Sequence, residues 1–301
     1  MKKIYAVIVT HNRQDLLLQC LDRLVSQTFV LENIVIVDNC STDGTISRLK
    51  DEILLKNPKI KLISLKENTG GAGGFSVGMK YAFDDGADFV WMMDDDALPQ
   101  KTALEELMNY ATSDHIYGSL AINGDYTAWT TTLIYKAKSV NLKNDIPVLA
   151  EVQSLPFLGY LTSKEIYKNI GLPDSRYFIS ADDTEYCMRA QQAGYKTFIC
   201  GKSFIEHPKS ERYNFYFLGK KLICLKLVPW KRYYDTRNRL LIARKYYGFK
   251  MYTQTIPSIL VRLIAALIHE DRKLLQIKAF LVGVYDGLIG KVGKRHDYWN
   301  L

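Results

Sequence analysis

The sequence has few cysteines and no long apolar run. The first shortage argues against a disulfide-bonded secreted protein, and the second argues against a membrane-spanning one. Its five cysteines, in 301 residues, form no CxxC pair and show no spacing typical of a zinc site. We therefore expect free thiols and a reducing compartment. No run of about 18 consecutive apolar residues occurs, and Met1–Lys3 leads into a strand-like stretch instead of a signal peptide. These absences predict a cytoplasmic protein.

The common phosphate-binding motifs are also absent. The stretch 68–75 contains four glycines at positions 70, 71, 73 and 74, but it is neither a GxGxxG motif with a downstream acid nor a P-loop. This disfavours a dinucleotide-dependent dehydrogenase and a kinase, and the lack of Lys or Arg at 70–74 disfavours a nucleotidyltransferase. The glycines still allow a ligand to approach the backbone where a predicted helix begins, and a helix N-terminus favours anions.

Positive charge is concentrated near the C-terminus. The composition, 48% hydrophobic and 24% charged, is that of a globular protein with a net charge of +8. Residues 209–295 contain 19 Lys and Arg against five Asp and Glu, a net charge of +14. Such a segment prefers nucleic acid or an anionic membrane surface, and charge alone does not choose between them.

The N-terminal half alternates short apolar runs with amphipathic patterns. This alternation predicts βαβ units on a parallel sheet, and hence an α/β fold. Expected strands are 4–9, 33–37, 60–65 and 89–93, and expected helices are 14–25, 45–54 and 74–83. From about 118 to 201 the pattern is mixed, with a helix predicted at 183–193. Beyond Pro208 the chain is basic, aromatic and helical in pattern.

Three carboxylates, Asp94, Asp95 and Asp96, follow the apolar run 89–93. The C-terminal ends of strands in an open α/β sheet are where ligands bind. Asp94 and Asp96 fall on the same side of a continued strand, so both can reach one hard divalent ion. The alternative is that Asp95 or Asp96 caps the helix that follows.

Polar residues also follow the first two predicted strands, at Thr10–Arg13 and at Asp38–Asn39. A buried Asp38 can accept the ring N–H of a uracil or thymine base. The alternative reading of Asp38–Asn39 and of 41–44 is turn and helix-cap chemistry.

Together these motifs resemble one family. The order Thr10-His11-Asn12-Arg13, Val37-Asp38-Asn39, Asn68 with its glycines and Trp91-Met92-Met93-Asp94-Asp95-Asp96 is similar to that of inverting glycosyltransferases of family 2, which have the nucleotide-sugar-binding GT-A fold. The resemblance covers most of the first 240 residues. Within the family, the glycines and the Asp triplet look most like galactofuranosyltransferases that use UDP-galactofuranose, with dTDP-rhamnose-dependent rhamnosyltransferases as the alternative.

The resemblance implies roles for the donor-side residues. Asp94 and Asp96, with His207 as third ligand, match positions that hold Mn²⁺ or Mg²⁺ on the donor diphosphate, although a lone His is more often structural. The positions that match the donor-binding set are Thr10, His11, Asn12, Arg13, Asp38, Asn68, Gly70, Gly71, Asp94 and Asp95.

A second acidic pair, Asp182 and Asp183, matches the catalytic motif of the family. The resemblance implies that Asp183 is the general base that deprotonates the acceptor hydroxyl, and that Asp182 shapes its surroundings or contacts the acceptor. The alternative, a helix N-terminus with acids in its first turn, is compatible with catalysis.

Acceptor contacts are the least specific prediction. Aromatic faces suit the apolar side of a sugar, although such residues are more often part of the core. Arg237, in Tyr233-Tyr234-Asp235-Thr236-Arg237-Asn238, either meets a phosphate or ties the C-terminal helices to the catalytic domain. The candidates are Trp129, Phe157, Gly159, Tyr160 and Arg237.

We therefore expect a GT-A catalytic domain at 1–215, with a nucleotide-sugar half at about 1–117 and an acceptor half at about 118–215. A basic, helical region at 216–301 should associate with the membrane or form a homodimer. These two uses compete, because both need the same apolar stripe of the C-terminal helices. The expected acceptor is lipid-linked or a polysaccharide, at the inner face of the cell membrane. The non-enzyme alternative, a nucleotide- or nucleic-acid-binding protein with a basic tail, leaves both acidic clusters unexplained.

Overall fold

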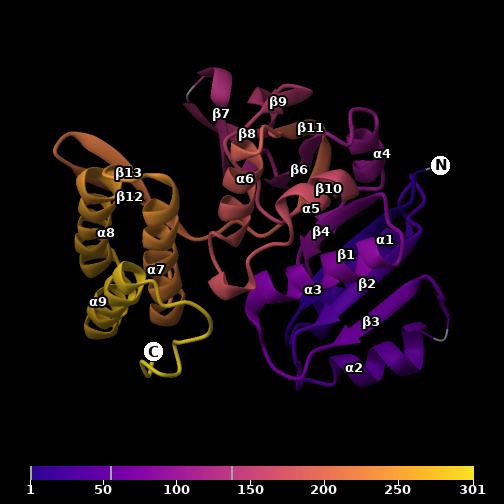
Figure 1. The fold of residues 1–301 in the computed structure, drawn as a ribbon, viewed down its shortest axis with the longest axis horizontal. Helices are drawn as coiled ribbons and strands as arrows, with labels where there is room; N and C mark the ends of the chain where they lie inside the picture. The colour runs from indigo at the N-terminus through magenta and orange to yellow at the C-terminus, as the bar shows by residue number, and fades with distance from the viewer. Residues whose placement is uncertain (1, 55, 137) are drawn as a thin grey trace. The chain divides into compact units, whose positions relative to one another are not determined.

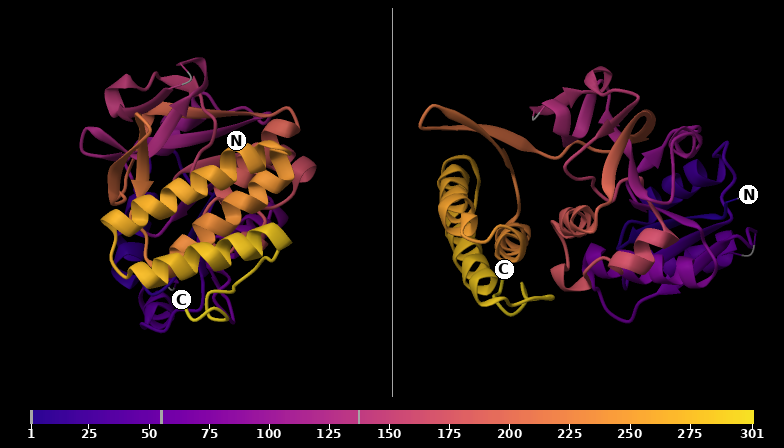
Figure 2. Two further views of the ribbon diagram at one scale, coloured as in Figure 1. Left: turned by 90° about the vertical axis from the view of Figure 1, so that its left-hand side faces the viewer. Right: turned by 45° about the horizontal axis from the view of Figure 1, so that its top comes forward.

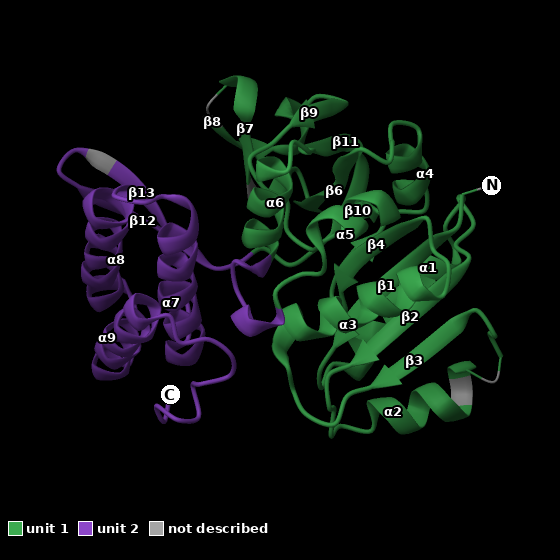
Figure 3. Ribbon diagram, viewed as in Figure 1, with its two compact units in different colours: residues 1–174, 183–209 green, residues 175–182, 210–301 purple. Residues whose placement is uncertain are grey.

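The computed structural model describes residues 2–54, 56–136 and 138–301. Its contacts divide the chain into two compact units (Figure 3). Unit 1 contains residues 1–174 and 183–209, and unit 2 contains residues 175–182 and 210–301. Unit 1 therefore carries both expected halves of the catalytic domain up to residue 209, apart from the short segment 175–182.

Unit 1 is built on one large mixed sheet (Figure 1). Its N-terminal strands are parallel in the order β3-β2-β1-β4, as the βαβ pattern predicts. Thr10 of β1 is in register with Asp38 of β2, and Val9 is in register with Asp94 of β4. The C-terminal ends of these strands thus meet at one edge of the sheet. The bounds are β1 Ile4–Thr10, β2 Asn33–Asp38, β3 Ile60–Ser64 and β4 Phe89–Asp94.

The other strands extend the sheet beyond β4. β10 is antiparallel to β4 and to β6, and β11 is parallel to β6. The remaining bounds are β5 Leu98–Pro99, β6 His115–Asn123, β7 Tyr126–Leu133, β8 Lys138–Leu142, β9 Leu149–Glu151, β10 Tyr160–Ser163 and β11 Lys196–Glu206.

Helices cover both faces of the sheet, so its central strands are buried on both sides. Alternate residues of β1 enter two separate hydrophobic clusters. Tyr5, Val7 and Val9 pack in the cluster that contains Phe75 of α3, whereas Ile4, Ala6 and Ile8 pack in the cluster that contains Leu17 of α1. The helices of unit 1 are α1 Gln14–Val25, α2 Thr45–Arg48, α3 Gly70–Asp84, α4 Ala103–Met108, α5 Lys164–Ile170 and α6 Asp182–Gln192.

Helix α3 differs from its prediction because it begins at Gly70, not at Gly74. Packing against the sheet requires glycine at Gly74 and Gly78 of this helix. A Cβ at Gly74 would come within 2.5 Å of Val9 Cγ1, and one at Gly78 would meet Val7 and Val37. The glycines therefore bring the helix close to β1 and β2. The predicted helix 45–54 is likewise interrupted, since Leu49–Leu54 is a π-helix.

Unit 2 contains three long helices that pack together (Figure 2). They are α7 Pro229–Tyr246, α8 Ile256–His269 and α9 Lys273–Ile289. Buried ion pairs and charged hydrogen bonds join them: Arg232 of α7 donates to Glu270 at 2.6 Å, and Tyr233 donates to Asp286 of α9 at 2.7 Å.

The expectation that the chain is helical from residue 216 is wrong at its start. Residues 212–225 form a hairpin of β12 Arg212–Phe217 and β13 Lys220–Leu225. Leu218 and Gly219 connect the strands with φ values of +47° and +73°, the left-handed pair of a tight two-residue hairpin turn. Alternating side chains that suit a strand are present in Arg212-Tyr213-Asn214-Phe215-Tyr216-Phe217. The basic character of the region concealed this alternation in the sequence.

Candidate active site

The candidate active site of unit 1 is built on an ion-pair network at the ends of β1 and β4. Asp95 is buried, and both of its carboxylate oxygens are occupied: Thr10 Oγ1 donates to Oδ2 at 2.7 Å and Arg13 Nη1 to Oδ1 at 3.2 Å. Burial raises the pKa of Asp95 despite the Thr10 hydrogen bond and the Arg13 charge, which lower it. Asp95 thus holds Thr10 and Arg13 in place, a role that the sequence did not reveal.

The two carboxylate oxygens of Asp96 have different partners. Its Oδ2 accepts from Arg13 Nη1 at 2.7 Å, and its Oδ1 lies 3.3 Å from His207 Nε2. Burial alone would raise the pKa of Asp96, but His207 and Arg13 outweigh it and lower that pKa. Conversely, burial lowers the pKa of His207, but the Asp96 carboxylate, with a smaller contribution from Asp94, raises it overall. The predicted association of His207 with the Asp triplet is therefore present in the geometry.

His207 reaches this place because β11 extends through Glu206 alongside β6. The backbone N–H of His207 donates to the Ile122 carbonyl at 3.0 Å, which continues the pairing of the two strands. The site thus combines residues more than a hundred positions apart.

The metal expectation can be tested against the chemistry of these donors. Among the described residues there is no cluster of three or more His, Cys, Asp or Glu side chains that could hold a metal ion. However, Asp96 Oδ1 has no interaction among the described residues beyond its 3.3 Å ion pair with His207 Nε2, and the buried His207 Nδ1 has no hydrogen-bond partner among them. An oxygen ligand and an imidazole facing each other suit Mn²⁺ or Mg²⁺ when diphosphate oxygens complete the coordination. These residues fit a shared metal and nucleotide site, not a metal cage made by the protein alone.

The helix-cap alternative for the Asp triplet is not supported. Helix α4 begins at Ala103 with Thr102 as its N-cap, six residues beyond Asp96. Asp94–Asp96 instead ends β4 and enters a turn in which Ala97 N–H donates to the Asp94 carbonyl at 3.2 Å. The carboxylates of the triplet therefore do not cap this helix.

Asp38 shows both of the properties that the sequence left open. Its Oδ2 accepts from the Ser41 N–H at 3.0 Å, which is turn chemistry. Its buried Oδ1 has no hydrogen-bond partner among the described residues, so it can accept from a ligand. Nearby, Asn12 Oδ1 accepts from the Thr42 N–H at 2.7 Å, which ties the β1–α1 loop to the β2–α2 loop. His11, in the same loop, is exposed.

The start of α3 is organised by two asparagines. Asn39 Nδ2 donates to the Gly70 carbonyl and Asn68 Oδ1 accepts from the Gly70 N–H, both at 2.8 Å. Gly70 has a φ of +73°, which favours glycine. A Cβ at Gly71 would have its nearest contact at 4.0 Å, so packing does not require glycine there. Asn68 thus binds the first N–H of α3, whose N-cap residue is Thr69, and Gly71 leaves space for a ligand.

The second acidic pair lies at the start of α6, as predicted. Asp182 is buried and Asp183 is half-buried. Asp183 Oδ1 accepts from the Thr184 N–H at 2.6 Å and lies 3.2 Å from Thr184 Oγ1. Partial burial raises the pKa of Asp183 to about 6, although the Thr184 hydrogen bonds act in the opposite direction. This value suits a general base near neutral pH.

The proposed acceptor residues do not form a stacking platform. Phe157 and Tyr160 are core residues, 4% and 0% exposed, with ring centroids 5.0 Å apart in an edge-to-face arrangement. Gly159 has a φ of +79°, and a Cβ there would collide with Ser119 and Ile205. Phe157 and Tyr160 are therefore core residues, the alternative stated for aromatic side chains, and Gly159 is required by its backbone conformation and close packing. Trp129 is half-buried on β7.

Arg237 is completely buried inside unit 2. It donates to the carbonyl oxygens of Tyr177 and Gly293 at 2.8 and 2.6 Å, so its guanidinium binds backbone of its own unit.

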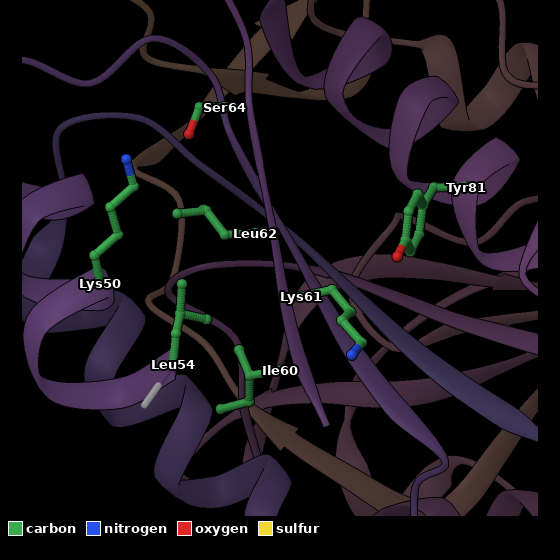
Figure 4. A pocket seen from close by; sticks show the side chains of 7 residues that line it. All are labelled: Lys50, Leu54, Ile60, Lys61, Leu62, Ser64 and Tyr81. Carbon is green, nitrogen blue, oxygen red and sulfur yellow. The ribbon is translucent and has the colours of Figure 1, made fainter. Parts of the chain in front are cut away.

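One open cavity of about 450 Å³ lies at the outer strand β3 (Figure 4). It contains none of the predicted site residues. Its lining consists of Lys50, Leu54, Ile60, Lys61, Leu62, Ser64 and Tyr81.

Comparison with known proteins identifies the family. The model of glycosyl transferase family 2 matches residues 5–161, just over half of the chain. The chain belongs to glycosyl transferase family 2. It is therefore a glycosyltransferase, as the motifs predicted.

Two curated relatives of this family 2 enzyme differ in their donor sugars. Galactofuranosyltransferase GlfT1 of Mycobacterium tuberculosis (strain CDC 1551 / Oshkosh) is 29% identical over 252 residues, which cover 79% of this chain and 81% of that protein. The dTDP-rhamnosyl transferase RfbF of Shigella flexneri is 26% identical, covering 96% of this chain and 97% of that protein.

Solved structures confirm the GT-A fold. A mannosyltransferase from Pyrobaculum calidifontis, in complex with GDP-Man and Mn²⁺, superposes with a TM-score of 0.60 at 14% identity and covers 96% of this chain and 88% of that one. GalNAc-T7, solved with UDP, GalNAc and Mn²⁺, gives a TM-score of 0.65 at 14% identity and covers 97% of this chain and 58% of that one. At this identity the likeness concerns the fold.

Proposed function

We propose that this family 2 enzyme is a metal-dependent inverting glycosyltransferase that moves galactofuranose from UDP-galactofuranose onto a lipid-linked or cell-surface polysaccharide acceptor. The observation that carries the proposal is the ion pair of Asp96 Oδ1 with His207 Nε2, at the edge of the sheet where Asp38 Oδ1 also has no hydrogen-bond partner among the described residues. A nucleotide with a diphosphate uses all of these groups.

On the donor side, Asp38 Oδ1 accepts the ring N–H of the uracil base, and the loop that contains Thr10, His11, Asn12 and Arg13 holds the nucleoside. Asp94, Asp96 and His207 would hold Mn²⁺ or Mg²⁺, and such an ion would supply positive charge to offset that on a departing UDP. At the start of α3, the backbone N–H of Gly71 would bind the diphosphate, whereas the N–H of Gly70 is already bound by Asn68.

On the acceptor side, Asp183 removes the proton from the attacking hydroxyl. That oxygen forms a bond to the anomeric carbon as the bond to the UDP oxygen breaks on the opposite face, so the anomeric configuration inverts. The raised pKa of Asp183 supports this role, because a carboxylate with a pKa near 6 is a stronger base than an ordinary one and is still deprotonated at neutral pH.

The alternative donor is dTDP-rhamnose. A match over nearly the whole length of RfbF favours it, whereas GlfT1 shares the higher identity. Because uracil and thymine present the same ring N–H, Asp38 does not distinguish the two nucleotides.

The donor is identified by turnover with a panel of UDP-galactofuranose, UDP-galactopyranose, UDP-N-acetylglucosamine and dTDP-rhamnose, each with a lipid-linked acceptor mimic and Mn²⁺. We expect UDP-galactofuranose to give the highest kcat/KM and EDTA to abolish turnover. UDP binding by calorimetry should weaken at least about tenfold in Asp96→Asn, as is typical when a metal site is impaired, but not in the exposed control Asp114→Asn. Higher kcat/KM with dTDP-rhamnose would replace the donor assignment, and EDTA-insensitive turnover would exclude the metal.

We also propose that the enzyme associates with the inner face of the cell membrane through unit 2. One stretch of the described residues, Met251–His269, is long and apolar enough to cross a membrane by length and composition, and 22% of its apolar window is buried. Ile259 and Ala266 on this stretch pack into the core of unit 2 with Phe280 of α9. Since one face is thus occupied by protein, the exposed face suits a helix that lies on the membrane surface.

A further inference from the structure

A short segment of unit 2 leads directly into the helix that carries Asp183. Residues 175–182, here named the lead-in segment, end at Asp182, where α6 begins. The contacts of this segment with α7 lie within unit 2. The chain therefore passes from the lead-in segment straight into α6, and Asp183 is the next residue after the segment.

The backbone of the lead-in segment is unusual. Phe178, Ser180 and Ala181 have φ values of +66°, +71° and +62°, in the left-handed region that residues with a Cβ rarely adopt. The Ile179 N–H donates to the Tyr177 carbonyl at 2.9 Å, which closes a tight turn around Phe178. Such a backbone persists only where its surroundings hold it.

Asn238 of α7 supplies most of that support. Its buried Nδ2 lies 3.1, 2.8 and 2.7 Å from the carbonyl oxygens of Tyr177, Ile179 and Ser180. Arg237 Nε donates to Asn238 Oδ1 at 2.8 Å, and this bond orients the amide so that its N–H groups face the three carbonyls. One side chain thus binds three carbonyl oxygens of the turn, which share its two N–H hydrogens.

Arg237 and Tyr234 complete the support. Arg237 Nη2 donates to the Tyr177 carbonyl at 2.8 Å, and its guanidinium lies 4.7 Å from the centre of the Tyr234 ring. Phe178 of the lead-in segment also contacts Tyr234, and the two rings stack with their centroids 5.0 Å apart. The motif Tyr233-Tyr234-Asp235-Thr236-Arg237-Asn238 is thereby explained by contacts with the protein itself.

We infer that Arg237 and Asn238 are positioning residues for sugar transfer: they hold the left-handed turn of the lead-in segment and so fix the start of α6 and the Asp183 carboxylate. The inference rests on the proposed role of Asp183 as the base. It assigns to two buried residues of unit 2 an effect on turnover that requires no contact with donor or acceptor.

The chain offers a matched control on the same helix. Arg232 is also buried, 1% exposed, and donates to the Leu225 carbonyl and to Glu270 at 2.8 and 2.6 Å. No described contact joins it to the lead-in segment. Replacing Arg232 removes a buried ion pair of unit 2 without releasing the turn, so it separates loss of stability from loss of positioning.

The experiment compares Asn238→Asp, Arg237→Lys and Arg232→Lys in the full chain. Asn238→Asp keeps the shape and the acceptor for Arg237 but turns a carboxylate oxygen toward three carbonyls, and Arg237→Lys is the milder variant. The readouts are kcat, donor KM, the thermal midpoint and amide hydrogen exchange of residues 175–183. We expect kcat to fall about 100-fold in Asn238→Asp, as for a misplacement of about 1 Å, with donor KM within about twofold. Exchange should rise in the lead-in segment.

Arg232→Lys should lower the thermal midpoint at least as much as Arg237→Lys while keeping kcat within about threefold. Wild-type kcat in folded Asn238→Asp overturns the inference. If Asn238→Asp does not fold, wild-type kcat in Arg237→Lys, or an equal loss of kcat in Arg232→Lys and Arg237→Lys, overturns it instead.

Asp183→Asn, measured in parallel, separates a failure of the base assignment of Asp183 from a failure of the positioning inference. If Asp183→Asn keeps turnover, the base assignment fails, and a faster exchange of residues 175–183 in Asn238→Asp still reports whether Asn238 holds the turn. If Asp183→Asn is inactive while Asn238→Asp is fully active, only the positioning inference fails.

Discussion

Single residues acquire their roles in this enzyme from partners far away in the sequence. The triplet Asp94-Asp95-Asp96 was recognisable as a site, but the division of labour within it was not. Asp95 is occupied by Thr10 and Arg13, whereas Asp96 turns one oxygen toward His207. Adjacent residues of a strand end point in different directions, so identical side chains face different surroundings.

The pH dependence of turnover tests the role of Asp183. Because the base must be deprotonated and burial raises the pKa of Asp183 to about 6, kcat/KM should rise with pH, about tenfold per unit below pH 6, and level off above about pH 7. Asp183→Asn should lower kcat by about 10² to 10⁴ fold and abolish this limb, while UDP binding stays unchanged. Steady-state kinetics from pH 5 to 8 and calorimetry with UDP measure both. An acid limb that persists in Asp183→Asn with near-native kcat refutes the assignment.

At the scale of elements, the sequence predicted best where one amphipathic pattern decides the structure. Helix α1 has the predicted bounds, Gln14–Val25, because its apolar face meets a single sheet face. Helix α3 starts earlier than predicted, since Asn39 and Asn68 bind the backbone of Gly70. The lead-in segment could not be predicted, because Asn238 and Tyr177 are 61 positions apart and no local pattern announces their contact.

The glycines of α3 separate packing from ligand binding. A Cβ at Gly74 would approach Val9 Cγ1 to 2.5 Å, so Gly74→Ala should lower the free energy of unfolding by about 1–3 kcal/mol. Gly71 has open space and serves as the matched position: Gly71→Ala should leave stability unchanged or raise it by up to about 1 kcal/mol. Urea unfolding measures both. If Gly71 approaches the diphosphate, Gly71→Ala weakens UDP binding in a fully folded protein; native UDP affinity removes Gly71 from the site.

At the scale of the whole molecule, the basic C-terminal region turned out to be a folded unit and not a tail. Helix α7 continues to Tyr246 and packs against α9, so truncation after Asn238 would cut through a helix and expose its core. Charge and periodicity predicted the helices, while the hairpin 212–225 and the buried ion pair Arg232–Glu270 depend on tertiary contacts. Membrane binding is therefore better tested by surface substitutions than by truncation.

Three apolar residues of α8, Leu260, Ile264 and Ile268, are 56%, 42% and 60% exposed and recur every fourth position, which places them on one helical face. Replacing all three by Ser should reduce flotation with vesicles of phosphatidylglycerol and phosphatidylcholine at least about tenfold, because burying each such side chain in a membrane contributes about 1.5–3 kcal/mol. Val25→Ser with Val30→Ser, at 57% and 66% exposure in unit 1, is the control and should float like the wild type. Light scattering in parallel identifies the competing use of this face. A wild-type dimer that becomes a monomer in the triple variant, with flotation unchanged, assigns the face to a second copy of the chain and contradicts the membrane proposal.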